Sequence, residues 1–106
     1  MLTIEQIRAL IHGGQFVVYG HLITELDKEG IPVEEATIIM LNGKSIKEWP
    51  ERQRVLEAGH TSDQVPAHVV CDLSIEDVLQ LVTGYIPDSR QWFGTKKRKP
   101  KRRGNA

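Results

Sequence analysis

Apolar residues near the start of the chain recur at the spacing of an α-helix. Residues three or four positions apart lie on one side of a helix, so such a stripe predicts a helix with one buried face. Thr3 followed by Gln6 has the pattern of a capping box, and Gly13-Gly14 ends the run. The stripe consists of Ile4, Ile7, Leu10 and Ile11.

Two further short helices are predicted after an extended segment at residues 15–19. Leu22 and Leu26 lie one turn apart within a helix expected at residues 21–29, which Gly30 ends. A third helix is expected to begin near Pro32, a residue that suits a first helical turn, and to end at Asn42-Gly43. Its apolar residues at helical spacing are Val33, Ala36 and Met40.

From Lys44 onward, short extended runs alternate with turn residues, which predicts an antiparallel meander. We expect four strands at residues 44–49, 54–59, 67–72 and 78–86, although residues 74–77 equally suit the start of a helical turn. Successive strands with short connections usually pair as neighbours. The predicted fold class is therefore α+β, with amino-terminal helices packed on a twisted four-stranded antiparallel sheet.

Length and composition limit the classes of protein to consider. A chain of 106 residues with 40% hydrophobic residues fits one domain. The single cysteine, Cys71, cannot form an intramolecular disulfide or a multi-cysteine zinc site. Without a signal-peptide pattern or a long apolar run, we expect a cytoplasmic protein with no membrane span. We expect no metal, because the four histidines lack ligand spacing, and no cofactor.

The formal net charge of zero hides a division along the chain. Seven of the 14 Lys/Arg residues lie beyond Gly94, whereas all 14 Asp/Glu residues lie before it. The body at residues 1–94 therefore carries about −7 and the tail at residues 95–106 carries +7. Such an arm, which we expect to be mobile, suits nucleic acid, but it equally suits contact with the acidic body or a role in solubility.

A set of short motifs between His21 and Trp92 resembles a known family, the bacterial domain of unknown function 4258. Its most specific part is the closing pattern Thr-x-Tyr-x-Pro-Asp followed by Trp, and the resemblance covers about two thirds of the chain. The other motifs are His21, Gly30-Ile31, an acidic helix, Asn42-Gly43, Ile46 with Glu48-Trp49-Pro50, and Pro66-Ala67-His68-Val69-Val70.

The resemblance implies a fold and an activity. The family is similar to RelE-like and barnase-like ribonucleases, and its members resemble toxins encoded beside a zinc-finger antitoxin. RNA or the ribosome and such an antitoxin are therefore the implied partners. The family helix commonly carries a histidine followed by arginines, whereas His21 is followed here by Glu25 and Glu29. The phosphate-binding charge of the family helix is therefore replaced here by charge of the opposite sign.

Metal-independent RNA cleavage needs a group that activates the 2′-hydroxyl, a group that protonates the leaving oxygen, and cations at the phosphate. The candidate catalytic residues are His21 and His68, as general base or acid, and Tyr85, as a donor or a stacking platform. Arg54 and Arg90 are candidate phosphate anchors, and Glu48 is another candidate base. Trp49 and Trp92 are candidate stacking residues, and Lys96, Lys97 and Arg98 are candidate RNA contacts.

Each candidate also has an ordinary structural interpretation. His68 alternates with Val70 and Asp72 on a strand, which is typical of a hydrogen-bonded structural histidine, and His21 suits helix packing or capping. Tyr85, Trp49 and Trp92 suit burial, whereas the arginines and Glu48 suit a solvated surface. Cys71 among valines indicates a small buried hydrophobe rather than a nucleophile.

The leading interpretation is therefore a metal-independent endoribonuclease, as the toxin of a toxin–antitoxin pair. The alternative is a noncatalytic nucleic-acid-binding or protein-interaction module. Self-association into a homo-oligomer through an exposed edge strand is a third interpretation.

Overall fold

A computed structural model describes residues 2–87. It contains three α-helices, α1 (Ile4–His12), α2 (Gly20–Lys28) and α3 (Glu34–Asn42), and a short 3-10 helix, η1 (Pro50–Arg52). The three predicted helices are therefore confirmed. The predicted capping box is also present, because Thr3 Oγ1 accepts from Gln6 N at 3.1 Å and Gln6 Oε1 accepts from Thr3 N at 2.8 Å.

The sheet has five strands, in the order β1-β5-β4-β3-β2. The four predicted strands are present as β2 (Lys44–Trp49), β3 (Arg54–His60), β4 (Pro66–Asp72) and β5 (Leu79–Tyr85), and successive members pair antiparallel. Residues 74–77 form a connection rather than a helix.

The expectation of four antiparallel strands was wrong at one edge, where β1 (Phe16–Val18) pairs with β5 in parallel. The segment was predicted as extended, but its partner lies 63 residues along the chain, with Phe16 opposite Leu79. Only tertiary packing decides such a pairing. The Leu79 N–H donates to Gln15 O at 3.0 Å and the Tyr19 N–H donates to Leu81 O at 2.9 Å, which extends the contact beyond the strand itself.

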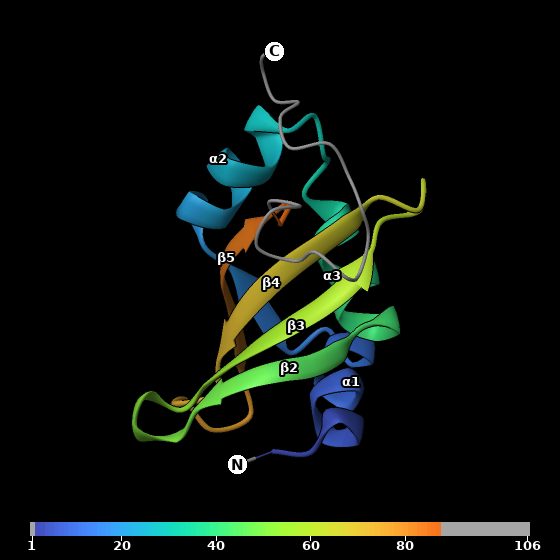
Figure 1. The fold of residues 1–106 in the computed structure, drawn as a ribbon. Coiled ribbons are helices and arrows are strands. Elements are labelled where there is room, and N and C mark those ends of the chain that lie inside the picture. The colour runs from blue at the N-terminus through green and yellow to red at the C-terminus, as the bar shows by residue number, and fades with distance from the viewer. Residues whose placement is uncertain (1, 88–106) are drawn as a thin grey trace.

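All three helices pack on one face of the sheet (Figure 1). The core lies between them and includes Ile7 of α1, Leu22 and Leu26 of α2, Ile39 and Met40 of α3, and the inward residues of β3, β4 and β5. Gly84 lets α2 approach closely, because a Cβ atom at this position would lie 3.2 Å from Leu26 Cδ2.

Within residues 2–87 no helix packs on the opposite face, which we call the helix-free face. No helix in this part of the chain has the length and apolar character needed to cross a membrane. The predicted tail, residues 95–106, lies outside the described residues.

Candidate functional site

The strand register fixes which side chains reach the helix-free face. Val55, Val69 and Leu81 belong to the core, so their strand neighbours on either side point the other way. Register shifts at Ile46 of β2 and Val82 of β5 interrupt the alternation, so Ser45 and Lys47 point to opposite faces, as do Leu81 and Thr83. The face consists of Lys44, Lys47 and Trp49 of β2, Arg54, Leu56, Ala58 and His60 of β3, Pro66, His68, Val70 and Asp72 of β4, Gln80, Thr83 and Tyr85 of β5, and Val17 of β1.

Two predicted catalytic residues lie together at one end of this face. His68 is directly opposite Tyr85 in the β4–β5 register, and their ring centroids lie 5.3 Å apart in an edge-on arrangement at 65°. Burial lowers the pKa of His68 to about 4 and raises the pKa of Tyr85. At neutral pH the pair is therefore an uncharged imidazole beside an uncharged phenol.

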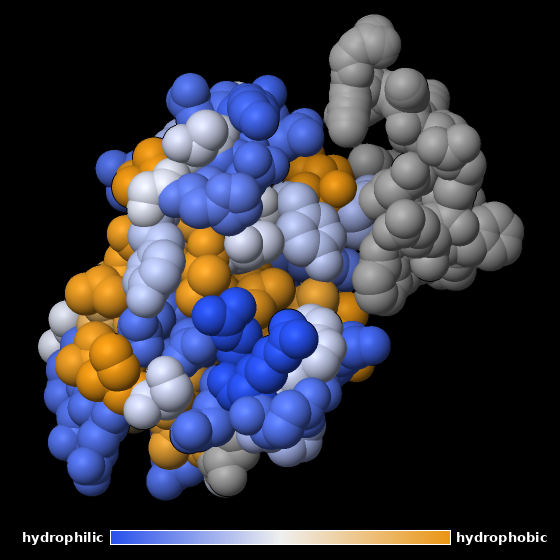
Figure 2. Space-filling view, turned by 90° about the vertical axis from the view of Figure 1, so that its left-hand side faces the viewer, coloured by the Kyte–Doolittle hydropathy of each residue, from blue (hydrophilic) through white to orange (hydrophobic). Residues whose placement is uncertain are grey.

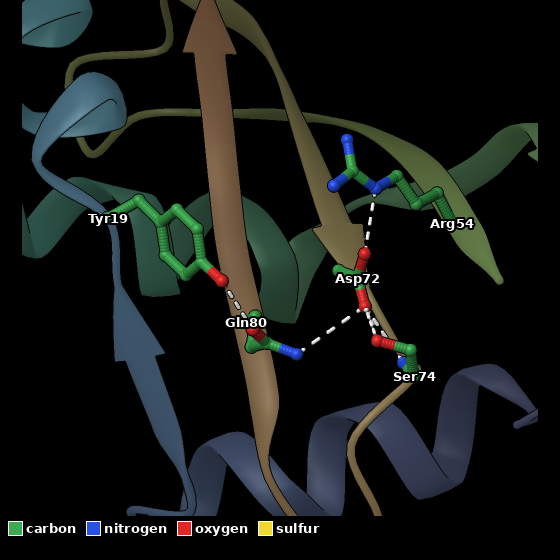
Figure 3. A network of polar contacts seen from close by, with 5 residues as sticks. All are labelled: Tyr19, Arg54, Asp72, Ser74 and Gln80. Carbon is green, nitrogen blue, oxygen red and sulfur yellow. Dashed lines mark hydrogen bonds and ion pairs between the residues drawn. The ribbon is translucent and has the colours of Figure 1, made fainter. Parts of the chain in front are cut away.

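Asp72 organises a polar network at the other end of the face (Figure 3). Its Oδ2 accepts from Arg54 Nε at 2.8 Å, and its Oδ1 accepts from Ser74 N at 2.8 Å, from Ser74 Oγ at 2.5 Å and, at 3.4 Å, from Gln80 Nε2. Tyr19 Oη in turn donates to Gln80 Oε1 at 2.5 Å. Burial alone would raise the pKa of Asp72, but the bonds from Ser74 and the bond and charge of Arg54 outweigh it, so the pKa is lowered.

The network leaves the distal part of Arg54 available. Only Nε bonds to Asp72, and no dashed line joins either terminal nitrogen to the carboxylate (Figure 3). Within residues 2–87 neither terminal nitrogen has a hydrogen-bond partner, and the side chain is 38% exposed. Asp72 thus holds the guanidinium in place while its two NH₂ groups remain able to bind an anion such as phosphate.

The His68–Tyr85 pair and the Arg54–Asp72 pair are well separated. Asp72 is four positions after His68 on β4, which corresponds to about 13 Å along a strand. The register places Arg54, His68 and Tyr85 on one face of the sheet. However, this separation keeps Arg54 from anchoring the phosphate on which His68 would act.

Charge is unequally distributed between the two faces. Lys44, Lys47 and Arg54 point to the helix-free face, where Asp72 is the only carboxylate supplied by β2–β5. Of the 13 described Asp/Glu residues, five lie on α1, α2 and α3, and the register turns two more, Glu48 and Glu57, toward these helices. Lys47 Nζ also lies 5.5 Å from the ring centroid of Trp49, so the β2 side of the face combines cations with an aromatic ring.

The β1 side of the face is apolar instead. Val17 is 47% exposed and Tyr19 is 41% exposed, and Ile23 of α2 is also exposed. Figure 2 shows this side of the molecule, with hydrophobic surface (orange) beside strongly hydrophilic residues (dark blue). The helix-free face therefore runs from a cationic margin at β2 to an apolar and aromatic margin at β1.

The other candidates do not join the His68–Tyr85 pair. His21 is exposed in the first turn of α2, a helix that packs on the opposite face of the sheet. Glu48 is exposed on β2, and Trp49 is partly buried. Cys71 is fully buried, and burial raises the pKa of its thiol to about 12, which keeps it an inert core residue. The remaining candidates lie outside the described residues: Arg90, Trp92, Lys96, Lys97 and Arg98.

Sequence reasoning did not identify Tyr19, Ser74 and Gln80 as site residues. Asp72 lies four residues after His68 on the same strand, so regular alternation places both side chains on one face. Gln80 cannot be placed in this way, because the register shift at Val82 moves it to the opposite face from the one that regular alternation along β5 gives. Among residues 2–87, no three His, Cys, Asp or Glu side chains come together in a metal-binding group.

A second polar cluster lies under the helices, away from the helix-free face. Glu57 is fully buried, and its Oε2 accepts from Ser45 Oγ at 2.5 Å. Its Oε1 is buried with no hydrogen-bond partner in the described part of the chain, as is Nε of Arg8, whose Nη2 donates to Gly43 O at 2.6 Å. Burial raises the pKa of Glu57, although the bond from Ser45 and the charge of Arg8 oppose this effect.

No protein-family model matches the chain, and neither a curated protein nor a solved structure shows significant similarity to it.

Proposed function

We propose that the helix-free face, together with the basic segment at residues 95–106, binds single-stranded RNA. The observation that carries this proposal is the alignment of Lys44, Lys47 and Arg54 on one sheet face while most carboxylates lie elsewhere. Cations spaced along a sheet suit a phosphate backbone, because neutralising phosphates releases condensed counterions. The basic segment follows β5 in the chain and adds seven further Lys/Arg residues to these cations.

Aromatic residues on this face give the proposal its preference for unpaired RNA. Trp49 and Tyr19 stand at opposite margins of the sheet, and aromatic rings stack on bases that are not held in a duplex. Stacking tolerates any base, so the expected binding has little sequence preference. The Arg54–Asp72 pair serves as a phosphate clamp in this arrangement, with Asp72 acting only to orient the guanidinium.

RNA cleavage by a RelE-like toxin fold is the second candidate. The observation in its favour is the contact between His68 and Tyr85, which supplies a neutral imidazole as proton acceptor beside a phenol as donor. Two features weigh against it. His68 is only 4% exposed, and the nearest clamp for phosphate lies at the other end of the face. Binding is therefore the function that the geometry supports better.

The binding proposal is tested by measuring the affinity for a fluorescent mixed-sequence RNA at several salt concentrations. Each phosphate contact contributes about 0.7 to the slope of log K against log salt for a single strand, so K44Q/K47Q should reduce the slope by about 1.4. Lys28→Gln is the matched control, since Lys28 is exposed and lies on α2. Deletion of residues 95–106 should reduce the slope further. Equal slopes for all of these proteins would refute the proposal.

The cleavage candidate needs a separate experiment. Purified protein is incubated with the same RNA in chelator, with and without ribosomes, alongside His68→Ala and Tyr85→Phe. If the chain is a ribonuclease, both folded variants should lose cleavage. Intact RNA with wild-type protein under all conditions, together with no growth arrest on expression, would exclude the toxin hypothesis and its zinc-finger antitoxin.

A further inference from the structure

An acidic pocket lies where the chain leaves the sheet. Its volume is about 260 Å³, and its walls come from the connection between α2 and α3, the first turn of α3 and the loop between β3 and β4. Ile86, which immediately follows β5, also lines it. The pocket therefore adjoins the point from which the carboxy-terminal residues continue.

Three carboxylates line this pocket, on Glu29, Glu35 and Asp63, and no Lys or Arg is among its described lining residues. Glu35 is held across the gap between α3 and the β3–β4 loop, because its Oε1 accepts from Ser62 N at 2.7 Å and from Ser62 Oγ at 3.2 Å. Its Oε2 takes part in neither bond. Ile31, Val65 and Ile86 add apolar surface to the same pocket. Such a site suits a cation carried on an aliphatic stem.

We infer that this pocket holds the chain's own carboxy-terminal segment, residues 88–98, with the Arg90 side chain between the carboxylates. Charge is one argument, since residues 2–87 contain six Lys/Arg against 13 Asp/Glu, whereas seven Lys/Arg follow Gly94. Reach is the other. Arg90 is three residues beyond Pro87, a span of about 10 Å when extended, and Lys96 follows within about 30 Å.

The short connection makes this docking effective although each ion pair is weak. Exposed pairs contribute little individually and are screened by salt. A short tether raises the effective concentration of the segment at the pocket to the millimolar range. Docking itself does not depend on RNA. Its regulatory consequence rests on the proposed function, because a segment held in the pocket is withdrawn from RNA, and RNA must displace it.

Docking is tested without RNA through the fluorescence of Trp92. Trp49→Phe leaves Trp92 as the sole tryptophan, since the chain has two. In this background the pocket set E29Q/E35Q/D63N is compared with the control set E5Q/E51Q/E76Q. Both sets remove three charges, but the control positions are exposed and line no part of this pocket.

We expect the pocket set to lower the ratio of docked to free segment by about tenfold, as the loss of three surface ion pairs predicts. Acrylamide should then quench Trp92 as readily as it does in the parent protein at high salt. R90Q should move quenching in the same direction, and the control set should not. Equal quenching in the two sets, or a change that depends on protein concentration, would overturn intramolecular docking.

The competition with RNA is tested on the same substitutions with Trp49 retained. The pocket set should bind RNA more tightly than the control set. Equal affinities would overturn the competition. If no form of the protein binds RNA, the proposed function fails, whereas the Trp92 result still decides whether the segment docks.

Discussion

His68 should make the folded protein sensitive to mild acid. Its side chain is 4% exposed, and burial lowers its pKa to about 4 from an ordinary value of 6.5. A histidine whose pKa is lowered by folding binds its proton more readily in the unfolded chain. Its contribution to stability is therefore complete above pH 6.5 and is lost as the pH falls toward 4.

The magnitude follows from the two pKa values. Linkage between protonation and folding gives a loss of about 2 kcal/mol in the free energy of unfolding between pH 7 and pH 5. The full loss, about 3.4 kcal/mol, is reached below pH 4. Either figure is a substantial part of the 5–15 kcal/mol that stabilises a typical domain.

The assay is urea unfolding of the wild-type protein and of His68→Gln at pH 7 and pH 5, followed by tryptophan fluorescence. The variant cannot titrate in this window, so its stability should decline less than that of the wild type, with the difference near 2 kcal/mol. Tyr85→Phe is the control, because it keeps the ring against His68 and should retain the acid sensitivity.

Other groups do not obscure this comparison. The pKa of Asp72 is lowered from 3.8, so its contribution is lost at lower pH than that of His68. Glu57 has a raised pKa and acts with the opposite sign, but it is present in both proteins. If wild type and His68→Gln lose equal stability between pH 7 and pH 5, the imidazole is hydrated in solution and the argument from burial is wrong.

Two further predictions concern the packing of the sheet against the helices. Gly59→Ala should destabilise the protein by about 1–3 kcal/mol in urea unfolding, since a Cβ atom would lie 2.5 Å from both Ile39 O and Asn42 Oδ1. Gly20→Ala is the control, because nothing lies within 4 Å of a Cβ atom at this position. Equal stability of the two variants would contradict the close approach at Gly59. Glu57→Gln should gain stability relative to wild type as the pH rises from 4 to 7, because a raised pKa means that folding opposes ionisation of the Glu57 carboxyl. If the free energy of unfolding changes with pH in the same way in both proteins, Glu57 ionises in the folded protein without penalty.

Local signals along the chain specify the helices and strands of this protein. Thr3 and Gln6 fix the start of α1 through bonds within four residues, and Gly30, at a φ of 73°, adopts the left-handed backbone that ends α2 at low steric cost. The short extended runs separated by turn residues also predicted the four antiparallel strands. These signals are local, because each depends on residues that are close in sequence.

Tertiary structure alone decided how the elements meet. The parallel pairing of β1 with β5 joins residues 63 positions apart, so no local pattern reveals it. The irregularity at Val82 changes the strand parity and brings Gln80 to Asp72, and the packing of α2 directs His21 away from His68. Glu57 reads as a surface residue in sequence but is fully buried, since the helices cover its side of β3. Long-range packing, rather than residue type, therefore set which polar groups came together.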